Sequence, residues 1–407
     1  MSEKNRLFIF LDEWKNDKNF IESELELIKN QFDVTVVCND FEDKDKYTYP
    51  DNVEFLFYKR KGGTALLLYL IRCFLNRDFW EEFSHLKNED NKYGKLSEVV
   101  RFFINSECFY SFLKRNDLIS NDKRTIYYTY WYFYKCFALT NHRKDIKGRI
   151  ITRTHEYDLY TESIPTGYQP FKYAMDKNLD KIIFIAEHGR QYYIDKYRFK
   201  TSDKYELYHL GTKDYGLNPY KKQDELVLVS CSSVIKRKRV HHIVEALGQI
   251  TDTKIHWIHF GNGDLFDELK KKASELLDSK ENISYELRGY TKHDEIMDFY
   301  SKNSVDAFMM VAVSEGNPVS VMEAMSYGIP VISYDICNMP NMIKDNGVLI
   351  SENSTVDDLA EAIKEFAMFD DDTVSRMRKN SRQIWEEDYN ETVNNKKFLE
   401  EILLSNE

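Results

Sequence analysis

The chain has 407 residues, which is enough for two globular domains or one unusually large one. Hydrophobic residues make up 42% and charged residues 31%, the composition of an ordinary soluble globular protein. The formal net charge of −11 argues against nucleic acid as the main partner. Six scattered cysteines without a C-x-x-C pair indicate buried thiols in a reducing compartment, and they exclude a disulfide or zinc framework. No apolar run approaches a membrane span and no signal peptide is recognisable, so we expect a cytoplasmic protein.

The first segment predicts one βαβ unit of a doubly wound fold, with a strand at 7–11, an amphipathic helix at 20–28 and a strand at 34–37. Residues 59–118 then carry apolar side chains at helical spacing: Leu66, Leu67, Leu70, Ile71, Phe74, Val99, Phe102, Phe103, Phe109 and Phe112. Five cations surround the first of these helices: Lys59, Arg60, Lys61, Arg72 and Arg77. Two interpretations stay open, a helical hairpin packed on the N-terminal domain or a membrane-surface helix that meets a lipid-linked acceptor.

A strand-like aromatic segment covers 126–134, and the next strand ends in a run of polar and titratable residues between 150 and 160. Arg153, His155 and Asp158 lie in this run, where α/β folds place their ligands. A lone histidine is ordinarily a satisfied structural residue, but with a cation and an acid beside it a functional role is the alternative. A further strand follows at 181–186, and the polar, turn-rich stretch 211–225 predicts an interdomain linker.

The second half opens with a strand at 226–231, a basic loop containing Lys236, Arg237, Lys238 and Arg239, and a helix at 240–247. Four cations at a strand-to-helix junction suit a diphosphate, although such a run is also typical of a solvated surface. The strand at 256–260 ends in a turn where Gly261 and Gly263 would let the backbone pass close to a nucleotide. A helix is predicted at 356–369, and the acidic triplet 370–372 indicates the N-cap region of the last helix, not a metal site.

The most informative stretch runs from the apolar strand 307–313 to the strand at 329–334. Between them Asn317 is predicted as an N-cap, with Pro318 at the first helical position and Gly328 ending the helix. The backbone N–H groups at such a helix start suit a phosphate. Glu315 and Glu323 lie eight residues apart, which suits the hydroxyls of a sugar and a ribose. The alternative is an ordinary βαβ helix with an incidental glutamate, which leaves the cost of an acid among apolar residues unexplained.

This stretch, SEGNPVSVMEAMSYGIPVI, resembles the E-x7-E signature of retaining glycosyltransferases of family 4. FIESEL at 20–25 and RTHEYDLY at 153–160 are similar to strings in members that build bacterial capsule and other surface polysaccharides. The resemblance covers nearly the whole chain, thinly over 40–125 and densely over 226–335. It departs from the family at two places: the loop 12–17 lacks the usual Gly-Gly pair, and Ser233 stands where an arginine is usual.

The resemblance implies a GT-B fold, an α/β architecture of two doubly wound Rossmann-like domains facing across a cleft. The expected domains are 1–218 with the helical insert 59–118, a nucleotide-sugar domain at 219–385, and a C-terminal helix at 386–407 that crosses back. The implied reaction moves a sugar from a nucleoside diphosphate sugar, UDP- or GDP-linked, to a hydroxyl of a glycan or lipid-linked acceptor, with retention and without a metal or further cofactor. Peripheral contact with the inner face of the cell membrane is a further expectation.

The resemblance also implies residue roles. Glu323 holds the ribose hydroxyls and Glu315 those of the donor sugar, while Lys238 and the backbone of Gly316, Asn317, Pro318 and Val319 neutralise the departing diphosphate. His155 contacts the sugar from the opposite domain. Donor contacts are further expected from Ser233, Arg237 and Gly261, with Tyr290 stacking on the base. Arg153 and Asp158 are expected on the acceptor side.

Two other functions are compatible with such a fold. A nucleotide-sugar 2-epimerase would need its own set of acid and base residues, which the sequence does not show. A non-catalytic subunit that binds glycan or a partner protein would be favoured by an altered glutamate pair, whereas Glu315 and Glu323 are both present.

Overall fold

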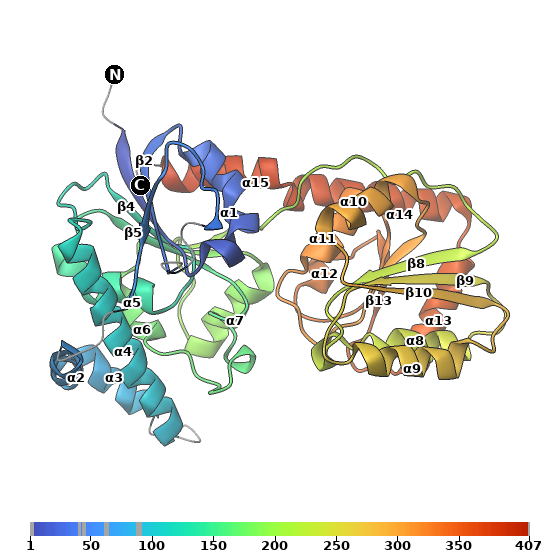
Figure 1. Ribbon diagram of the computed structural model, residues 1–407, viewed down its shortest axis with the longest axis horizontal. Helices are drawn as coiled ribbons and strands as arrows, with labels where there is room; N and C mark the ends of the chain where they lie inside the picture. Colours follow the sequence, from blue (N-terminus) through green and yellow to red (C-terminus); the bar gives the residue numbers. More distant parts are fainter. Residues whose placement is uncertain (1–3, 40–41, 43–45, 61–64, 87–91, 406–407) are drawn as a thin grey trace. The chain divides into compact units, whose positions relative to one another are not determined.

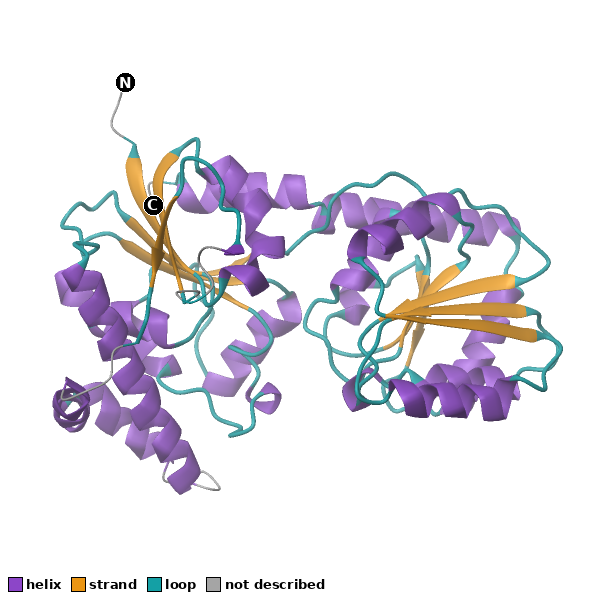
Figure 2. Ribbon diagram, viewed as in Figure 1, coloured by secondary structure: helices purple, strands orange, loops and turns teal. Residues whose placement is uncertain are grey.

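The computed structural model describes residues 4–39, 42, 46–60, 65–86 and 92–405. The chain forms two compact units, an N-terminal unit of Met1–Tyr208 with Asn395–Glu407 and a C-terminal unit of His209–Asn394. Each unit is a twisted parallel sheet with helices on both faces (Figures 1 and 2). This is the α/β architecture that the sequence predicts.

The sheet of the N-terminal unit has the order β3-β2-β1-β4-β5-β6-β7, with every neighbouring pair parallel. The strands are β1 (Asn5–Phe10), β2 (Phe32–Cys38), β3 (Glu54–Phe57), β4 (Ile126–Thr129), β5 (Arg149–Thr154), β6 (Lys181–Phe184) and β7 (Tyr205–Leu207). Helices α1 (Trp14–Ile28), α5 (Tyr134–Asn141), α6 (Lys172–Asn178) and α7 (Glu187–Tyr197) cover its faces. The order reverses between β1 and β4, which is where doubly wound sheets bind their ligands.

The aromatic segment predicted as a strand over 126–134 is extended only as far as Thr129. The backbone leaves the sheet there because the buried carboxylate of Asp158 accepts a hydrogen bond from the Tyr132 N–H at 2.7 Å. Residues 130–133 therefore form a loop at the carboxyl edge of the sheet.

Three helices fill the insert between β3 and β4: α2 (Ala65–Leu75), α3 (Arg77–Leu86) and α4 (Lys92–Arg115). Val99, Phe102, Phe103 and Phe109 of α4 are buried, as a hairpin packed on the domain requires. Leu67, Ile71 and Phe74 of α2 are exposed, so helical spacing alone overestimates the burial of that helix. Lys61, one of the cations in the predicted cluster, lies outside the described residues.

The sheet of the C-terminal unit has the order β10-β9-β8-β11-β12-β13, again all parallel. Its strands are β8 (Leu226–Cys231), β9 (Ile255–Phe260), β10 (Ile283–Gly289), β11 (Ala307–Met310), β12 (Val331–Tyr334) and β13 (Gly347–Ile350). Its helices are α8 (His241–Gln249), α9 (Phe266–Leu277), α10 (His293–Lys302), α11 (Val319–Ser326), α12 (Met339–Met342), α13 (Val356–Ala367) and α14 (Asp371–Ile384). Asp370 caps α14 by accepting from the Thr373 N–H, as the acidic triplet predicts.

The unit boundaries differ from the predicted positions 218 and 386. The stretch 211–225 is not a free linker, because the Asn218 N–H bonds the Tyr327 carbonyl at 3.0 Å and its amide bonds the Tyr300 carbonyl at 2.6 Å. Beyond α15 (Glu391–Lys397) the chain rejoins the N-terminal unit, where Phe398, Leu399, Ile402 and Leu403 are buried in its core. Among the described residues no helix is both long enough and apolar enough to cross a membrane.

Candidate functional site

The polar groups of the C-terminal unit gather at the switch point of its sheet, where β8 and β11 are neighbours. The basic loop follows β8 and the glutamate loop follows β11, so the two loops meet at the carboxyl edge. The Val313 N–H donates to the Arg237 carbonyl at 2.8 Å, which joins them by backbone. The parallel register therefore brings together two sequence motifs about 80 residues apart, as the doubly wound pattern predicts.

Glu315 is buried and forms ion pairs with two cations of the basic loop. The Lys238 ammonium forms an ion pair with Glu315 Oε1, and Arg237 Nη1 lies 3.4 Å from the same oxygen. Arg237 Nη1 also donates to the Ser314 carbonyl at 2.7 Å. The charge run is therefore not a solvated surface at these two residues.

The other members of the basic loop point elsewhere. Arg239 donates to the carbonyls of Val311 and Ala312 at 2.9 and 2.8 Å, and its guanidinium covers the Tyr334 ring, so it fixes backbone. Ser233 is exposed. Of the two arginines that could replace the one missing at Ser233, Arg237 is the one that reaches the Glu315 carboxylate.

Helix α11 begins at Val319 with Pro318 as its N-cap residue, one position later than predicted. The prediction that Asn317 caps the helix is wrong, because its side-chain oxygen accepts a hydrogen bond from Asn338 Nδ2 at 3.2 Å. A small pocket at this helix start is lined by both loops, with Ser232, Lys238, Glu315, Pro318 and Ser320 among its residues. The helix ends as predicted at Gly328, whose φ of +69° few other residues adopt.

Glu323 lies in the buried face of α11 and has a partner that sequence reasoning missed. His293 Nε2 is 2.8 Å from Glu323 Oε1, and this hydrogen bond raises the pKa of the half-exposed histidine above its ordinary value. The Tyr215 ring lies 6.2 Å from the His293 ring. The signal was available, since His293 follows β10 at the same carboxyl edge as the two loops.

Gly261 and Gly263 have a packing role in the turn after β9. A Cβ on Gly261 would lie 1.8 Å from the Ser232 carbonyl oxygen, and one on Gly263 would lie 2.5 Å from that of Val234. The glycines thus let this turn pack directly against the loop after β8. Tyr290, after the neighbouring strand β10, is 80% exposed. Their contacts with a nucleotide stay predictions.

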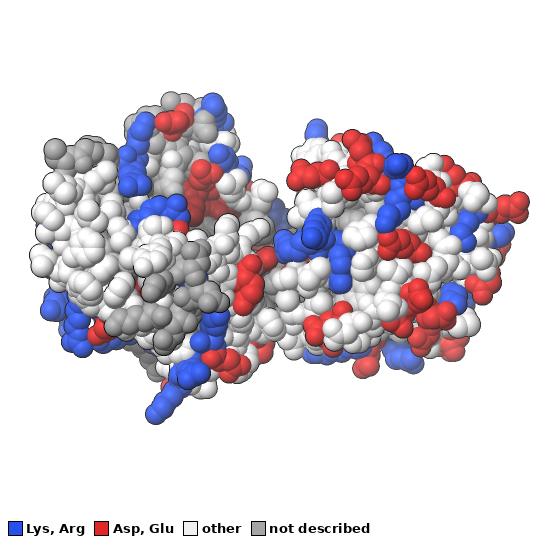
Figure 3. Space-filling model, turned by 90° about the horizontal axis from the view of Figure 1, so that it is seen from below, with Lys and Arg blue, Asp and Glu red and all other residues white. Residues whose placement is uncertain are grey.

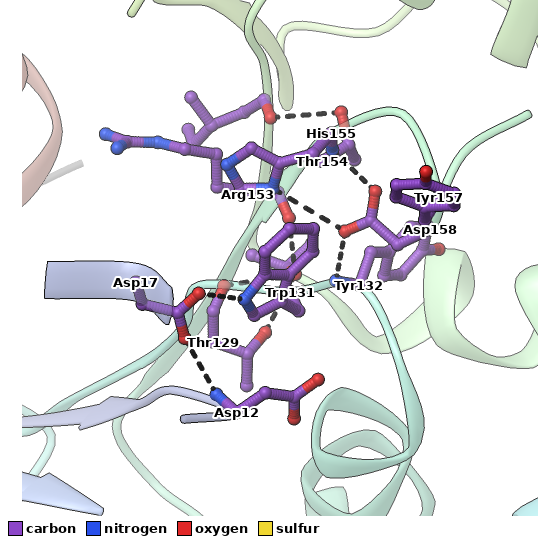
Figure 4. A network of polar contacts seen from close by, with 12 residues as sticks. Asp12, Asp17, Thr129, Trp131, Tyr132, Arg153, Thr154, His155, Tyr157 and Asp158 are labelled. Atoms are coloured by element: carbon purple, nitrogen blue, oxygen red, sulfur yellow. Dashed lines mark hydrogen bonds and ion pairs between the residues drawn. The ribbon is translucent and has the colours of Figure 1, made fainter. Parts of the chain in front are cut away.

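In the N-terminal unit, His155 stands at the carboxyl end of β5 with its ring against that of Trp131, at a centroid distance of 4.3 Å (Figure 4). The Tyr130 ring lies 4.9 Å from it. Both ring nitrogens are buried and lack a hydrogen-bond partner among the described residues. The nearest acid, Asp158, approaches Nδ1 only to 3.8 Å. Because buried polar atoms are ordinarily paired, this imidazole has the capacity to bind a ligand or a water molecule.

The structure gives Arg153 and Asp158 structural tasks in place of the predicted acceptor-side position. Asp158 is fully buried, and its carboxylate accepts the N–H groups of His155 and Tyr132 at 2.5 and 2.7 Å, which shapes the loops around the histidine. Arg153 is buried in an ion pair with Glu24 at 2.7 Å and covers the Phe398 ring at 4.5 Å. Neither side chain faces solvent.

A second buried acid, Asp17, was also missed. Its carboxylate accepts the Asp12 N–H and Trp131 Nε1–H, both at 3.1 Å, and so connects the loop after β1 to the loop after β4 (Figure 4). Burial raises the pKa of Asp17 to about 6. The Trp131 ring in turn contacts His155, so Asp17 fixes one wall of the histidine's surroundings.

Comparison with known proteins gives related sequences. Residues 218–384 match the family model of glycosyl transferases group 1. The chain is 24% identical over 268 residues to the "Putative colanic acid biosynthesis glycosyltransferase WcaL" of Escherichia coli (strain K12), covering 62% of this chain and 64% of that protein. It is 28% identical over 134 residues to the O-antigen biosynthesis glycosyltransferase WbnH of Escherichia coli, covering 33% and 35%. The chain thus spans less than two thirds of the length of these relatives.

Solved structures resemble the chain over nearly its whole length. The lipopolysaccharide outer core galactosyltransferase WaaB in its apo form has a TM-score of 0.68 at 16% identity, covering 98% of this chain and 99% of that one. Anabaena HepE in complex with UDP and glucose has a TM-score of 0.65 at 11% identity, with the same coverage. Two parallel Rossmann-like sheets and these neighbours establish that the chain has the GT-B fold of glycosyltransferases.

Proposed function

We propose that the chain is a retaining glycosyltransferase of family 4. It transfers a sugar from a UDP- or GDP-linked donor to a hydroxyl of a glycan or lipid-linked saccharide in bacterial surface polysaccharide synthesis. The names of WcaL and WbnH support this class of acceptor. We expect it to act in the cytoplasm at the inner face of the membrane and to use no metal or other cofactor.

The observation that carries the proposal is the buried Glu315–Lys238 ion pair at the switch point, beside the start of α11. Lys238 lines the pocket at the start of α11, and Arg237 lies 3.4 Å from the same carboxylate oxygen. In this proposal the backbone N–H groups of Gly316, Asn317 and Val319 act together with them. Pro318 has no N–H and contributes only its fixed φ. Fixed positive groups of this kind stabilise the charge that develops on a departing diphosphate, which lowers the barrier to transfer.

The two glutamates have separate tasks in this proposal. Glu315 holds Lys238 in place and accepts hydrogen bonds from hydroxyls of the donor sugar. Glu323, which His293 holds by its Oε1 atom, accepts the ribose hydroxyls. Tyr290 is exposed at the same edge of the sheet and stacks on the base.

His155 contacts the donor sugar through a ring nitrogen, which gives one of its unpaired polar atoms a partner. In the transfer the bond from the anomeric carbon to the diphosphate oxygen breaks, and a bond from that carbon to the acceptor oxygen forms on the same face. The acceptor proton passes to the leaving phosphate oxygen, so no separate general base is required.

The test measures release of the free nucleoside diphosphate from UDP- and GDP-hexoses, with water as the acceptor. We expect slow release by the native chain. After Lys238→Met or Glu323→Ala the rate of release should fall by a factor of about 100 or more. Lys236→Met is the matched control, because Lys236 is an exposed cation of the same loop. Glu323→Ala should also weaken nucleotide binding by calorimetry.

Equal rates and affinities in these variants would refute the proposal. Binding without release would favour a non-catalytic subunit, and formation of a sugar epimer would favour an epimerase. With an acceptor in hand, the anomeric configuration of the product, read by NMR, tests retention.

A further inference from the structure

Helix α2 is apolar on nearly every side, although only one side of it packs on the protein. Tyr69 and Cys73 are buried against α4, whereas the opposite side exposes a continuous set of large apolar residues. These are Leu67, Leu68, Ile71, Phe74 and Leu75, of which Leu75 is 79% exposed. A helix that is apolar all round normally lies in a protein core or a membrane.

The length of α2 decides how it meets a bilayer. Its 11 residues extend about 16 Å, roughly half the thickness of the hydrocarbon layer, so it does not span one. A short helix of this kind lies in the plane of the interface, with its apolar side at the boundary between headgroups and acyl chains.

Helix α3 continues the same surface and makes it rigid. Trp80 is half exposed, and its indole N–H donates to the Phe74 carbonyl at 2.8 Å. Its ring packs edge-on against Phe79, which packs in the same way against Phe74. Tryptophan is the side chain most typical of a membrane interface, because its ring is both apolar and a hydrogen-bond donor.

The segment that leads into and forms α2 is basic, whereas α3 carries the acids Asp78 and Glu81. Lys59 pairs with Glu42 at 3.1 Å and Arg77 with Glu81 at 2.9 Å. Residues 55–77 contain five cations and no acid, within a chain whose net charge is −11. In Figure 3 uncharged side chains cover a wide area of the N-terminal unit, with both basic and acidic side chains at its margins. Local positive charge beside an apolar surface complements an anionic lipid bilayer and not an apolar protein groove.

A pocket of about 630 Å³ adjoins α2 and is lined in part by Arg72, Leu75, Lys114, Arg115 and His142. Its one acid, Glu107, is buried and already bonded to Arg72 and His142, at 3.2 and 2.6 Å. Lys114 and Arg115 add further positive charge to the lining. A pocket with this lining beside an interfacial helix suits the phosphate of a lipid headgroup.

We propose that the surface of Leu67, Leu68, Ile71, Phe74, Leu75 and Trp80, termed the α2–α3 face, docks the chain on an anionic bilayer. Helix α2 lies at the headgroup boundary, and the surrounding cations contact lipid phosphates. Docking would bring the N-terminal unit to a lipid-linked acceptor, and this purpose is the one part of the inference that rests on the proposed function.

The test is co-sedimentation of the full chain with vesicles of phosphatidylglycerol and phosphatidylcholine in equal parts. We expect binding to these vesicles, weaker binding to pure phosphatidylcholine, and release as salt is raised. The triple variant Leu67→Gln, Ile71→Gln, Leu75→Gln should have an affinity for these vesicles that is lower by a factor of about ten or more. The matched control changes three exposed apolar residues of the C-terminal unit, Leu276→Gln, Val393→Gln and Met368→Gln, and should bind as the native chain does.

The charge contribution is tested separately with Lys59→Glu and Arg77→Glu, which should weaken binding to the anionic vesicles only. Native chain that stays in the supernatant, or a triple variant that sediments like it, overturns the proposal. A native dimer that the triple variant converts to a monomer also overturns it, because a second copy would then cover the face. Nucleotide release in vesicle-free solution should be equal in native chain and triple variant, so failure of docking and failure of the proposed function are distinguishable.

Discussion

The buried carboxyl of Asp17 should make the N-terminal unit less stable as the pH rises. Its pKa is about 6 in the folded chain against an ordinary value of 3.8, chiefly because burial disfavours the charged form. The Trp131 indole and the Asp12 N–H lower this pKa, as does the charge of Lys135, while the Asp12 carboxylate raises it. Between these two values the folded state holds a proton that the unfolded chain has released, so stability falls with rising pH.

A difference of about two pH units corresponds to ~3 kcal/mol between the acid limit and neutral pH. The share lost between about pH 4.5 and 7.5 is ~2 kcal/mol. Asp17→Asn removes this dependence. The same change costs a constant amount, about 1–3 kcal/mol, because an amide has one acceptor oxygen for the two donors Asp12 N and Trp131 Nε1.

The measurement is the free energy of unfolding in urea at those two pH values, read from hydrogen exchange of peptides covering β1 and β4. The difference between native chain and Asp17→Asn should move by ~2 kcal/mol in favour of the variant from the lower pH to the higher. Asp33→Asn, an exposed acid on β2, is the control and should show no such movement. The same difference at both pH values would refute the assignment of a raised pKa to Asp17.

Three further changes test other parts of the structure. Arg153→Met should destabilise the N-terminal unit by about 3–5 kcal/mol in urea unfolding, because it leaves Glu24 buried and unpaired, and adding Glu24→Gln should recover part of the loss. Gly261→Ala should lower the midpoint of thermal unfolding more than Gly216→Ala, since both glycines have positive φ but only Gly261 faces a carbonyl; equal losses would contradict the packing role. His293→Gln should flatten the pH dependence of UDP affinity in calorimetry. In the native chain loss of the histidine proton above its raised pKa removes the positive charge beside the carboxylate that accepts the ribose, and an unchanged slope would exclude this link.

The sequence predicted the fold well where strands are buried on both faces. Runs such as 226–229 and 307–310 are apolar throughout, as a parallel sheet covered on both faces requires. The prediction failed where a single tertiary contact decides the backbone. Residues 130–133 have strand-forming side chains, yet Asp158 draws the Tyr132 N–H out of the sheet. Local propensity carries no information about a carboxylate 26 residues later.

The candidate site likewise contains contacts that the sequence could predict and contacts that it could not. The pairing of Lys238 with Glu315 follows from the topology, because parallel strands bring the loops after β8 and β11 to one edge. The burial of Arg153 could not be inferred, since its partner Glu24 looks like an ordinary surface acid of an amphipathic helix. His293 was missed for the opposite reason. Its sequence neighbours are unremarkable, and the only signal was its position after β10, at the carboxyl edge where it contacts Glu323.

Four buried carboxylates, those of Asp17, Asp158, Glu315 and Glu323, stand at the carboxyl edges of the two sheets. Each has a dedicated donor, which limits the cost of burial but does not remove it, because replacing a buried ion pair by apolar residues is often neutral or stabilising. A chain shaped by stability alone has no reason to hold acids here. The proposed function supplies such a reason, since hydroxyl groups and a departing phosphate need acceptors and cations held rigidly in a dry place. In this proposal the same buried acids lower the stability of the chain and support its activity. The urea experiment measures the first effect, and nucleotide release measures the second.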